Sequence, residues 1–221
     1  SILLEFIDSS NAFNDDFLNF IANFNKIDFN SNQEKILDLL RIISKIASNH
    51  QRPKTFFEKI RRIFQNIIPN NQSLISSEIL DIFQSNRTIL LFLLEQEIII
   101  PDESNLKILM NYEINGYKYK HLLYSAIKKY IDNDLQNQIE SEIKQIFNEK
   151  IESFNEKVKT GENDSYISQL IRDDSVEQFI SFINRTNISL NSTITPNIFE
   201  TNSFLLNRKP SLIEYATFFG S

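Results

Sequence analysis

Cysteine is absent from the 221-residue chain, and only three glycines occur. Without cysteine, disulfide frameworks and thiolate metal sites are excluded. Phosphate-cradling loops need clustered glycines so that backbone N–H groups can approach the anion, whereas Gly116, Gly161 and Gly220 stand far apart. The scarcity of glycine also argues against a β-fold with many tight turns.

Long apolar runs are missing as well. The longest, Ile89 to Leu94, is far shorter than the ~20 residues that span a bilayer. Glu5 and Asp8 interrupt the early apolar stretch, so we expect no signal peptide and an intracellular, cytoplasmic location; residues 2–7 read as the end of a helix that starts earlier. The net charge of −6 argues against a broadly basic nucleic-acid or anionic-membrane surface.

Helical periodicity is what the sequence contains. Between residues 36 and 47 apolar side chains recur at steps of three and four, which places them on one helix face. Ser31 with Glu34, and Thr55 with Glu58, have the spacing of capping boxes, which predicts helix starts there. We therefore predict an all-α fold of stacked helical hairpins.

Other segments predict how these helices are arranged. Residues 89–94 are apolar all round, which places them at the centre of the first domain, followed by a buried connector at 98–100. One long helix from Asp134 to Lys159 is predicted to pack against both the first domain and a helical pair that starts at Ser165. Residues 204–206 are predicted to be extended.

The C-terminal residues Ser211-Leu-Ile-Glu-Tyr-Ala-Thr-Phe-Phe-Gly220-Ser221 resemble the first helix of an ankyrin repeat, whose motif reads Thr-Pro-Leu-His-x-Ala-Ala-x-x-Gly-His. Glu214 replaces the His and Leu212 replaces the Pro of that motif. The matching positions are Ser211 for the Thr, Ile213 for the Leu, Ala216 for the first Ala, and Gly220.

The pair that starts at Ser165 is similar to a more diverged copy, with Ser175 opening its second helix. The two starts are 46 residues apart, against a period of about 33, so we expect an insertion after Ile183. Residues 161–172 and 198–206 resemble the segment that leads into the array of the expanded ankyrin-repeat families of trichomonad protists, where a helical region of unknown function precedes the repeats.

The resemblance implies an N-terminal helical domain at 1–160 and a truncated, degenerate ankyrin-like solenoid at 161–221. It further implies a non-catalytic protein-interaction scaffold, with protein partners and more repeats beyond Ser221. Because the last repeat would lack a neighbour, Phe218 and Phe219 are expected to be partly exposed.

A basic and aromatic cluster at 112–130 offers the alternative function, nucleic-acid binding, in which bases stack on tyrosines and lysines hold phosphates. The simpler interpretation is that the tyrosines are half-buried core residues and the lysines form a solvated face. The cluster comprises Tyr112, Tyr117, Lys118, Tyr119, Lys120, His121, Tyr124, Lys128, Lys129 and Tyr130.

Three further groups were weighed as sites, and the simpler interpretation is preferred for each. The basic run Arg52, Lys54, Lys59, Arg61 and Arg62 is expected to be the exposed side of an amphipathic helix rather than a site for an acidic partner. Neither His50 nor His121 has a carboxylate at metal-ligand spacing. The pairs Asp15-Asp16 and Asp173-Asp174 fall at helix boundaries, where Asp caps N–H groups. We therefore predict no catalytic, cofactor or metal residues, and no enzyme.

Overall fold

The computed structural model of the chain describes residues 33–49, 56–67, 76–84, 86–114 and 117–220, together with Asn19. These residues form α-helices joined by turns and, between Thr186 and Ser203, by a longer loop, which confirms the all-α prediction. The one β-ladder within them is a two-residue antiparallel pair, Glu113 with Lys118 and Ile114 with Tyr117. Ser31, His50, Thr55 and the Asp15-Asp16 pair lie outside the described residues.

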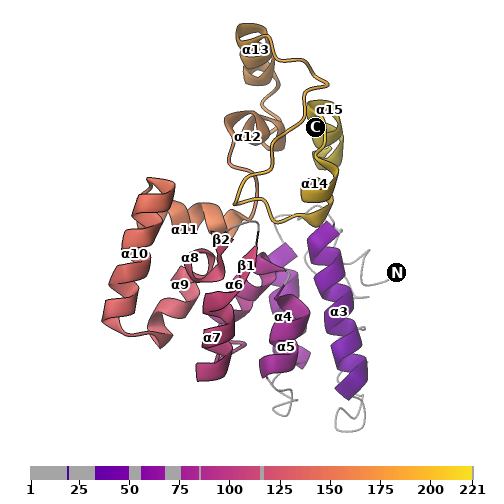
Figure 1. Cartoon of the computed structure of the whole chain (residues 1–221). Coiled ribbons are helices and arrows are strands. Elements are labelled where there is room, and N and C mark those ends of the chain that lie inside the picture. The colour runs from indigo at the N-terminus through magenta and orange to yellow at the C-terminus, as the bar shows by residue number, and fades with distance from the viewer. Residues whose placement is uncertain are drawn as a thin grey trace.

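The helices divide into a larger group and a smaller group of four that is in contact with it (Figure 1). The larger group comprises α3 (Gln33–Asn49), α4 (Phe56–Ile67), α5 (Ser76–Phe83), α6 (Arg87–Glu95), α7 (Glu103–Asn111), α8 (Tyr119–Leu122), α9 (Tyr124–Ile127), the 3-10 turn η2 (Lys128–Tyr130), α10 (Asn133–Phe147) and α11 (Ile151–Thr160), with β1 (Glu113–Ile114) and β2 (Tyr117–Lys118) between α7 and α8. The other four are α12 (Tyr166–Arg172), α13 (Val176–Thr186), α14 (Ser203–Arg208) and α15 (Leu212–Phe219).

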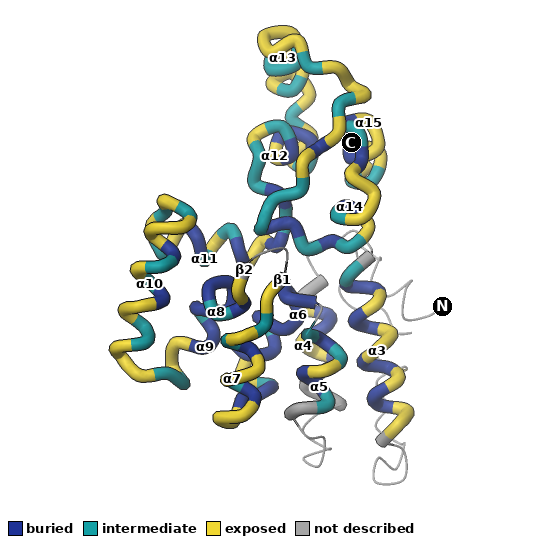
Figure 2. Tube along the Cα trace, in the orientation of Figure 1, coloured by how far each residue is buried: buried dark blue, intermediate teal, exposed yellow. Residues whose placement is uncertain are grey.

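Helix α6 lies at the centre of the larger group, as its uniformly apolar sequence predicts. Asn86 caps it, because the side-chain oxygen accepts the Ile89 N–H at 3.2 Å. The helix packs against α5, α9 and α11, and most of its side chains are buried (Figure 2). In the connector that follows, Ile99 is buried but Ile100 is exposed, so the prediction of a buried connector holds for only part of it.

The amphipathic stripe of α3 also faces the core as predicted. Its buried side chains pack toward α5, and the Ser44 hydroxyl donates to the Ile82 carbonyl at 3.3 Å. Asn86 reaches across from α6 and donates to the Ser44 carbonyl at 3.2 Å. The buried stripe residues are Ile36, Leu39, Leu40, Ile43, Ile46 and Ala47.

The prediction of one long helix from Asp134 to Lys159 is wrong, because the chain breaks between α10 and α11. Asn148 adopts the left-handed conformation (φ 51°), and its N–H donates to the Lys144 carbonyl at 3.0 Å. The apolar pattern continues across the break, since the Phe147 and Phe154 rings lie 4.6 Å apart between centroids. Because the apolar residues keep the same helical spacing on both sides of Asn148, the sequence gives no sign of the turn between the two helices.

Residues 204–206 are also not extended as predicted but lie in α14. Asn202 supplies the start signal, because its side-chain oxygen accepts the N–H groups of Phe204 at 3.0 Å and Leu205 at 3.4 Å. A six-residue helix is too short to show an apolar period.

The buried apolar residues form two clusters. The larger one contains core residues of α3 to α11 and, from farther along the chain, Phe199. The smaller one consists of Ile171, Ile194, Leu205, Leu212 and Tyr215, with partly buried side chains around it. The clusters thus separate near Gly161, which ends α11 with a left-handed φ of 66°.

Candidate protein-interaction surface

Exposed large apolar side chains gather on the smaller group of helices. Within the described residues, six side chains between positions 166 and 213 are each 40–53% exposed. We call these six residues the C-terminal surface. They are Tyr166, Val176, Ile180, Leu190, Phe204 and Ile213.

Helix α13 contributes the outermost part of this surface. Val176, Phe179, Ile180 and Ile183 recur at helical spacing, and Phe179 and Ile183 pack partly buried against the smaller cluster. Val176 and Ile180 face solvent, and α13 contains no fully buried residue (Figure 2). The helix packs against α12. It therefore presents an apolar edge next to its own packing face.

An aromatic pair lies beside that edge. The rings of Tyr166 and Phe182 meet edge to face at 5.3 Å, and the Arg185 guanidinium lies 5.8 Å from the Phe182 ring. These three residues line an open depression of about 230 Å³, together with Glu177, Gln178 and Ser181. Tyrosine and arginine next to exposed aliphatic side chains are typical of protein interfaces.

A second aromatic group joins α14 to α15. Phe204 stacks on Phe218 at 5.5 Å, Phe218 contacts Phe219 at 5.1 Å, and Phe219 contacts Tyr215 at 4.8 Å. Tyr215 is buried, whereas Phe218 and Phe219 are only partly buried. The predicted partial exposure of both phenylalanines is therefore confirmed.

The start of α15 is a capping box. The Ser211 hydroxyl accepts the Glu214 N–H at 3.3 Å, and the Glu214 carboxylate accepts the Ser211 N–H at 2.8 Å. The Ser211 hydroxyl also donates to the same carboxylate at 3.0 Å. The hydrogen bond from the Ser211 N–H and then that from its hydroxyl lower the pKa of Glu214. The preceding loop is anchored alongside, because Ile194 donates to the Pro210 carbonyl at 2.9 Å and Leu212 donates to Ser192 at 3.0 Å.

Arg172 ties α12 to α15 beneath the surface. Its guanidinium donates to the Tyr215 hydroxyl at 3.0 Å, to the Asn163 carbonyl at 2.7 Å and to the Glu162 carboxylate at 2.7 Å. Burial raises the pKa of Tyr215 to about 12 despite the nearby guanidinium. The α12–α15 contact is therefore polar as well as apolar.

The structure buries three members of the 112–130 cluster. Tyr119 and Tyr124 are buried, and their hydroxyls donate to the Gln84 carbonyl at 2.5 Å and to Glu140 at 2.7 Å. Burial is the main reason that the pKa of each tyrosine is raised. Neither ring is available for base stacking, so the geometry does not favour the nucleic-acid alternative, which stays a prediction.

Three charged members of that cluster lie in ion pairs, whereas Lys118 and Lys128 are exposed. His121 Nε2 and Lys120 Nζ lie 2.7 Å and 2.5 Å from one Glu142 oxygen. Burial alone would raise the pKa of Glu142, but hydrogen bonds from Lys120, His121 and Gln138 outweigh it and lower the pKa to about 2. Lys129 pairs with Glu97. The contacts of Lys120 and His121 with Glu142 join α8 to α10.

The remaining sequence candidates have structural positions. Lys59 is buried rather than exposed, so the prediction of a wholly solvated basic face is wrong at that residue, whereas Arg61 and Arg62 are exposed. Asp173 ends α12 and Asp174 lies in the turn that follows (φ 50°), which confirms their predicted place at a helix boundary.

The described part of the chain offers little for a metal ion, a small molecule or a membrane. It contains no group of three or more His, Cys, Asp or Glu side chains placed to hold a metal ion. A pocket under α7, lined by Leu109, Tyr112 and Tyr119 among others, has a volume of about 30 Å³, which is room for about one water molecule. Among these residues no helix has the length and apolarity needed to cross a bilayer.

Comparisons with known proteins add no relative: the chain matches no family model, no curated protein and no solved structure.

Proposed function

We propose that this chain is a non-catalytic helical scaffold that binds protein through the C-terminal surface. This proposal is based mainly on the half-exposed apolar side chains that are concentrated between α12 and α15. Exposed large apolar side chains are costly in water, and a concentration of them is typical of binding surfaces. Arg185 and Tyr166 beside Ile180 add residue types that often anchor protein partners.

We also propose that α12, α13 and α15 are parts of two degenerate ankyrin-like repeats. In support, α12 packs against α13, its hairpin partner, and against α15, the corresponding helix of the next unit. The Ser211–Glu214 capping box braces the turn where the motif has Thr and His. Helix α14 lies within the connection between the units and accounts for part of the extra spacing.

This repeat proposal predicts that a further repeat can cover the outer face of α15, where Ile213 is half exposed and Phe218 partly exposed. Fusing a consensus ankyrin repeat after Ser221 should raise the melting temperature. A flexible Gly/Ser segment of equal length is the matched control and should leave it unchanged. Equal melting temperatures for the two fusions would contradict the repeat proposal.

The binding proposal is tested by cross-linking and affinity capture with the full chain. A Val176→Ser/Ile180→Ser variant should recover the partner at least about tenfold less well, because loss of a central apolar anchor typically costs over 1 kcal/mol per residue. The matched control, Ile100→Ser/Ile108→Ser, changes two equally exposed side chains far from α13. Equal losses in both variants, or no partner for the unmodified chain, would refute the proposal.

A further inference from the structure

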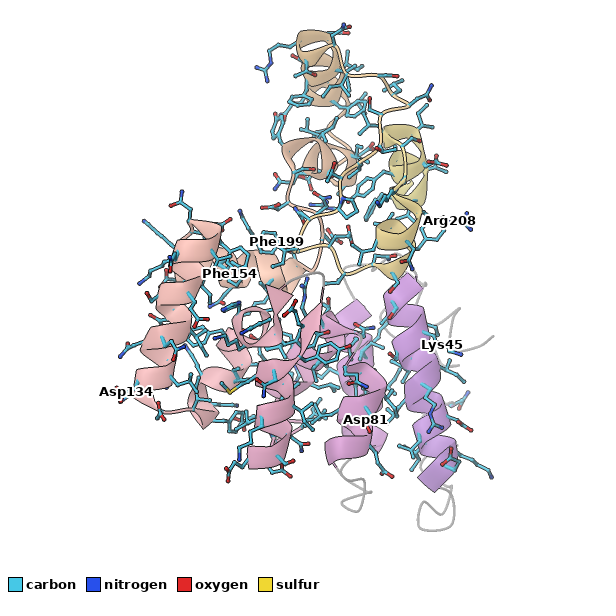
Figure 3. The ribbon with its side chains drawn as sticks, in the orientation of Figure 1. Lys45, Asp81, Asp134, Phe154, Phe199 and Arg208 are labelled. Atoms are coloured by element: carbon cyan, nitrogen blue, oxygen red, sulfur yellow. The ribbon has the colours of Figure 1, made fainter. Side chains whose placement is uncertain are left out.

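The segment that precedes α14 returns to the larger group of helices. Phe199 is buried in the larger cluster, and its ring lies 5.7 Å from that of Phe154 in α11. Figure 3 shows the two side chains side by side where the two groups of helices meet. We call residues 197–201 the strap.

Main-chain and hydroxyl groups of the strap bond to α6. Arg87 Nη2 donates to the Phe199 carbonyl at 3.0 Å, and the Thr88 hydroxyl donates to the Thr201 hydroxyl at 2.8 Å. Both donors are buried in the first turn of α6. These bonds join residues more than 110 positions apart in the sequence, at the centre of the larger group.

The strap is also bonded to the chain segment that links the two groups. The Thr201 hydroxyl and N–H both donate to the Gly161 carbonyl, at 2.7 Å and 3.0 Å. Asn197 donates to the Asn163 side-chain oxygen at 3.2 Å and to the Asp164 carboxylate. Its own side-chain oxygen accepts the N–H of Phe199 at 3.0 Å, which holds the strap in a turn.

Lys157 in α11 contacts both the linking segment and the strap. Its ammonium lies 2.6 Å from Glu149, 2.8 Å from Asp164 and 5.4 Å from the centre of the Phe199 ring. The two carboxylates raise the pKa of Lys157, Asp164 being the larger influence. One side chain thus bridges α11, the linking segment and the strap.

We infer that the strap fixes the orientation of α12, α13 and α15 relative to the larger group of helices. Two units joined by a short segment and a modest interface move relative to one another unless something holds them. The strap supplies that hold, beside the packing of α14 against α3, through one buried ring and four hydrogen bonds at Phe199 and Thr201.

The smaller cluster contains no strap residue: its buried members are Ile171, Ile194, Leu205, Leu212 and Tyr215. Release of the strap should therefore leave the C-terminal helices folded but loosen their orientation, which then depends on the linking segment and the α14–α3 contact. The consequence is that the C-terminal surface faces a fixed direction while the strap is bound. This inference goes beyond the proposed function and holds whether or not that surface binds protein.

The test uses the absence of cysteine from the chain. Nitroxide labels at Asn137→Cys in α10 and Gln178→Cys in α13, both exposed positions, report the distance between the two groups by pulsed electron resonance. The unmodified strap should give one narrow distance distribution. Thr201→Val, which keeps the shape but removes the hydroxyl bonds, should broaden it, and the Phe199→Ala/Thr201→Val pair should widen it roughly twofold or more.

Two further measurements separate release from unfolding. Amide hydrogen exchange of α12, α13 and α15 should stay slow in both strap variants. The matched control Phe218→Ala, in α15 and outside the strap, should keep the distribution narrow. A narrow distribution in folded Thr201→Val and in the double variant would overturn the inference. Fast exchange throughout α12 to α15 in Thr201→Val would also overturn it, because the strap would then be part of that unit's own core.

Discussion

His121 Nε2 lies 2.7 Å from a carboxylate oxygen of Glu142, so the helix that follows the β-ladder is joined to α10 by a largely buried pair. Lys120 shares the same oxygen at 2.5 Å. His121 and Lys120 belong to the 112–130 segment, for which the sequence suggests a nucleic-acid surface, whereas Glu142 lies in α10. The pair should therefore contribute to the stability of the fold.

The pH dependence of stability should report this pair. The folded-state pKa of Glu142 is lowered from 4.5 to about 2, so its ionised form stabilises the fold above pH 4.5, and that contribution is lost as pH falls from 4.5 toward 2. Glu142→Gln should therefore lower the melting temperature near neutral pH and differ less from the unmodified chain at low pH. Thermal scans across that range measure it.

The matched control is Glu103→Gln. Glu103 also pairs with a lysine, Lys107, at 2.7 Å, but both side chains are well exposed, and exposed pairs contribute about 0–1 kcal/mol. A Glu142→Gln deficit that is the same at every pH would contradict the assignment of a lowered pKa to Glu142.

Phe154→Asp should destabilise the chain strongly. The ring is fully buried between Phe147 and Phe199, so the change removes apolar burial and leaves a buried carboxylate without a designed partner. We expect a loss of more than about 3 kcal/mol in the free energy of unfolding by denaturant titration. Ser153→Asp, which places the same carboxylate on the exposed side of α11, should be close to neutral. Similar stability for the two variants would show that Phe154 is not in the core.

The capping box of α15 should have a measurable effect. Ser211→Ala removes the hydroxyl that accepts the Glu214 N–H and should cost about 1 kcal/mol. Ser211→Thr keeps an oxygen there and is the residue of the ankyrin motif, so it should retain most of the stability. Ser181→Ala, on the exposed side of α13, is the control for loss of a hydroxyl. Chemical denaturation of the four proteins compares them, and equal losses for Ser211→Ala and Ser181→Ala would contradict the capping role.

The elements that sequence reasoning found are those with strong local signals. The stripe of α3 is predicted because its apolar residues recur at the helical period, and α6 because residues 89–94 are apolar all round; the structure buries both. Asp173 and Gly161 mark helix ends in the structure as in the sequence. Partial exposure of Phe218 and Phe219 followed from the repeat resemblance.

The features that the sequence did not predict also have physical causes. The contacts of Arg87 and Thr88 with the strap join positions more than 110 residues apart, and no spacing rule connects them. Helix α14 is too short to show a period, although Asn202 was a readable cap. Lys59 lies in a basic run, and its burial depends on what packs around α4 rather than on the run itself. The strap contacts and the burial of Lys59 depend on tertiary packing, which local sequence patterns do not show.

Asn148 offers the sharpest test of the break between α10 and α11, because a turn and a continuous helix predict opposite results. In the left-handed conformation (φ 51°), glycine has no Cβ penalty, whereas a β-branched residue costs about 1–2 kcal/mol. Asn148→Gly should therefore be neutral or stabilising, and Asn148→Val should be destabilising by about that amount in denaturant titrations. Inside a continuous helix glycine would instead be the worse residue by roughly 0.5 kcal/mol, so a Gly variant less stable than the Val variant would restore the single long helix.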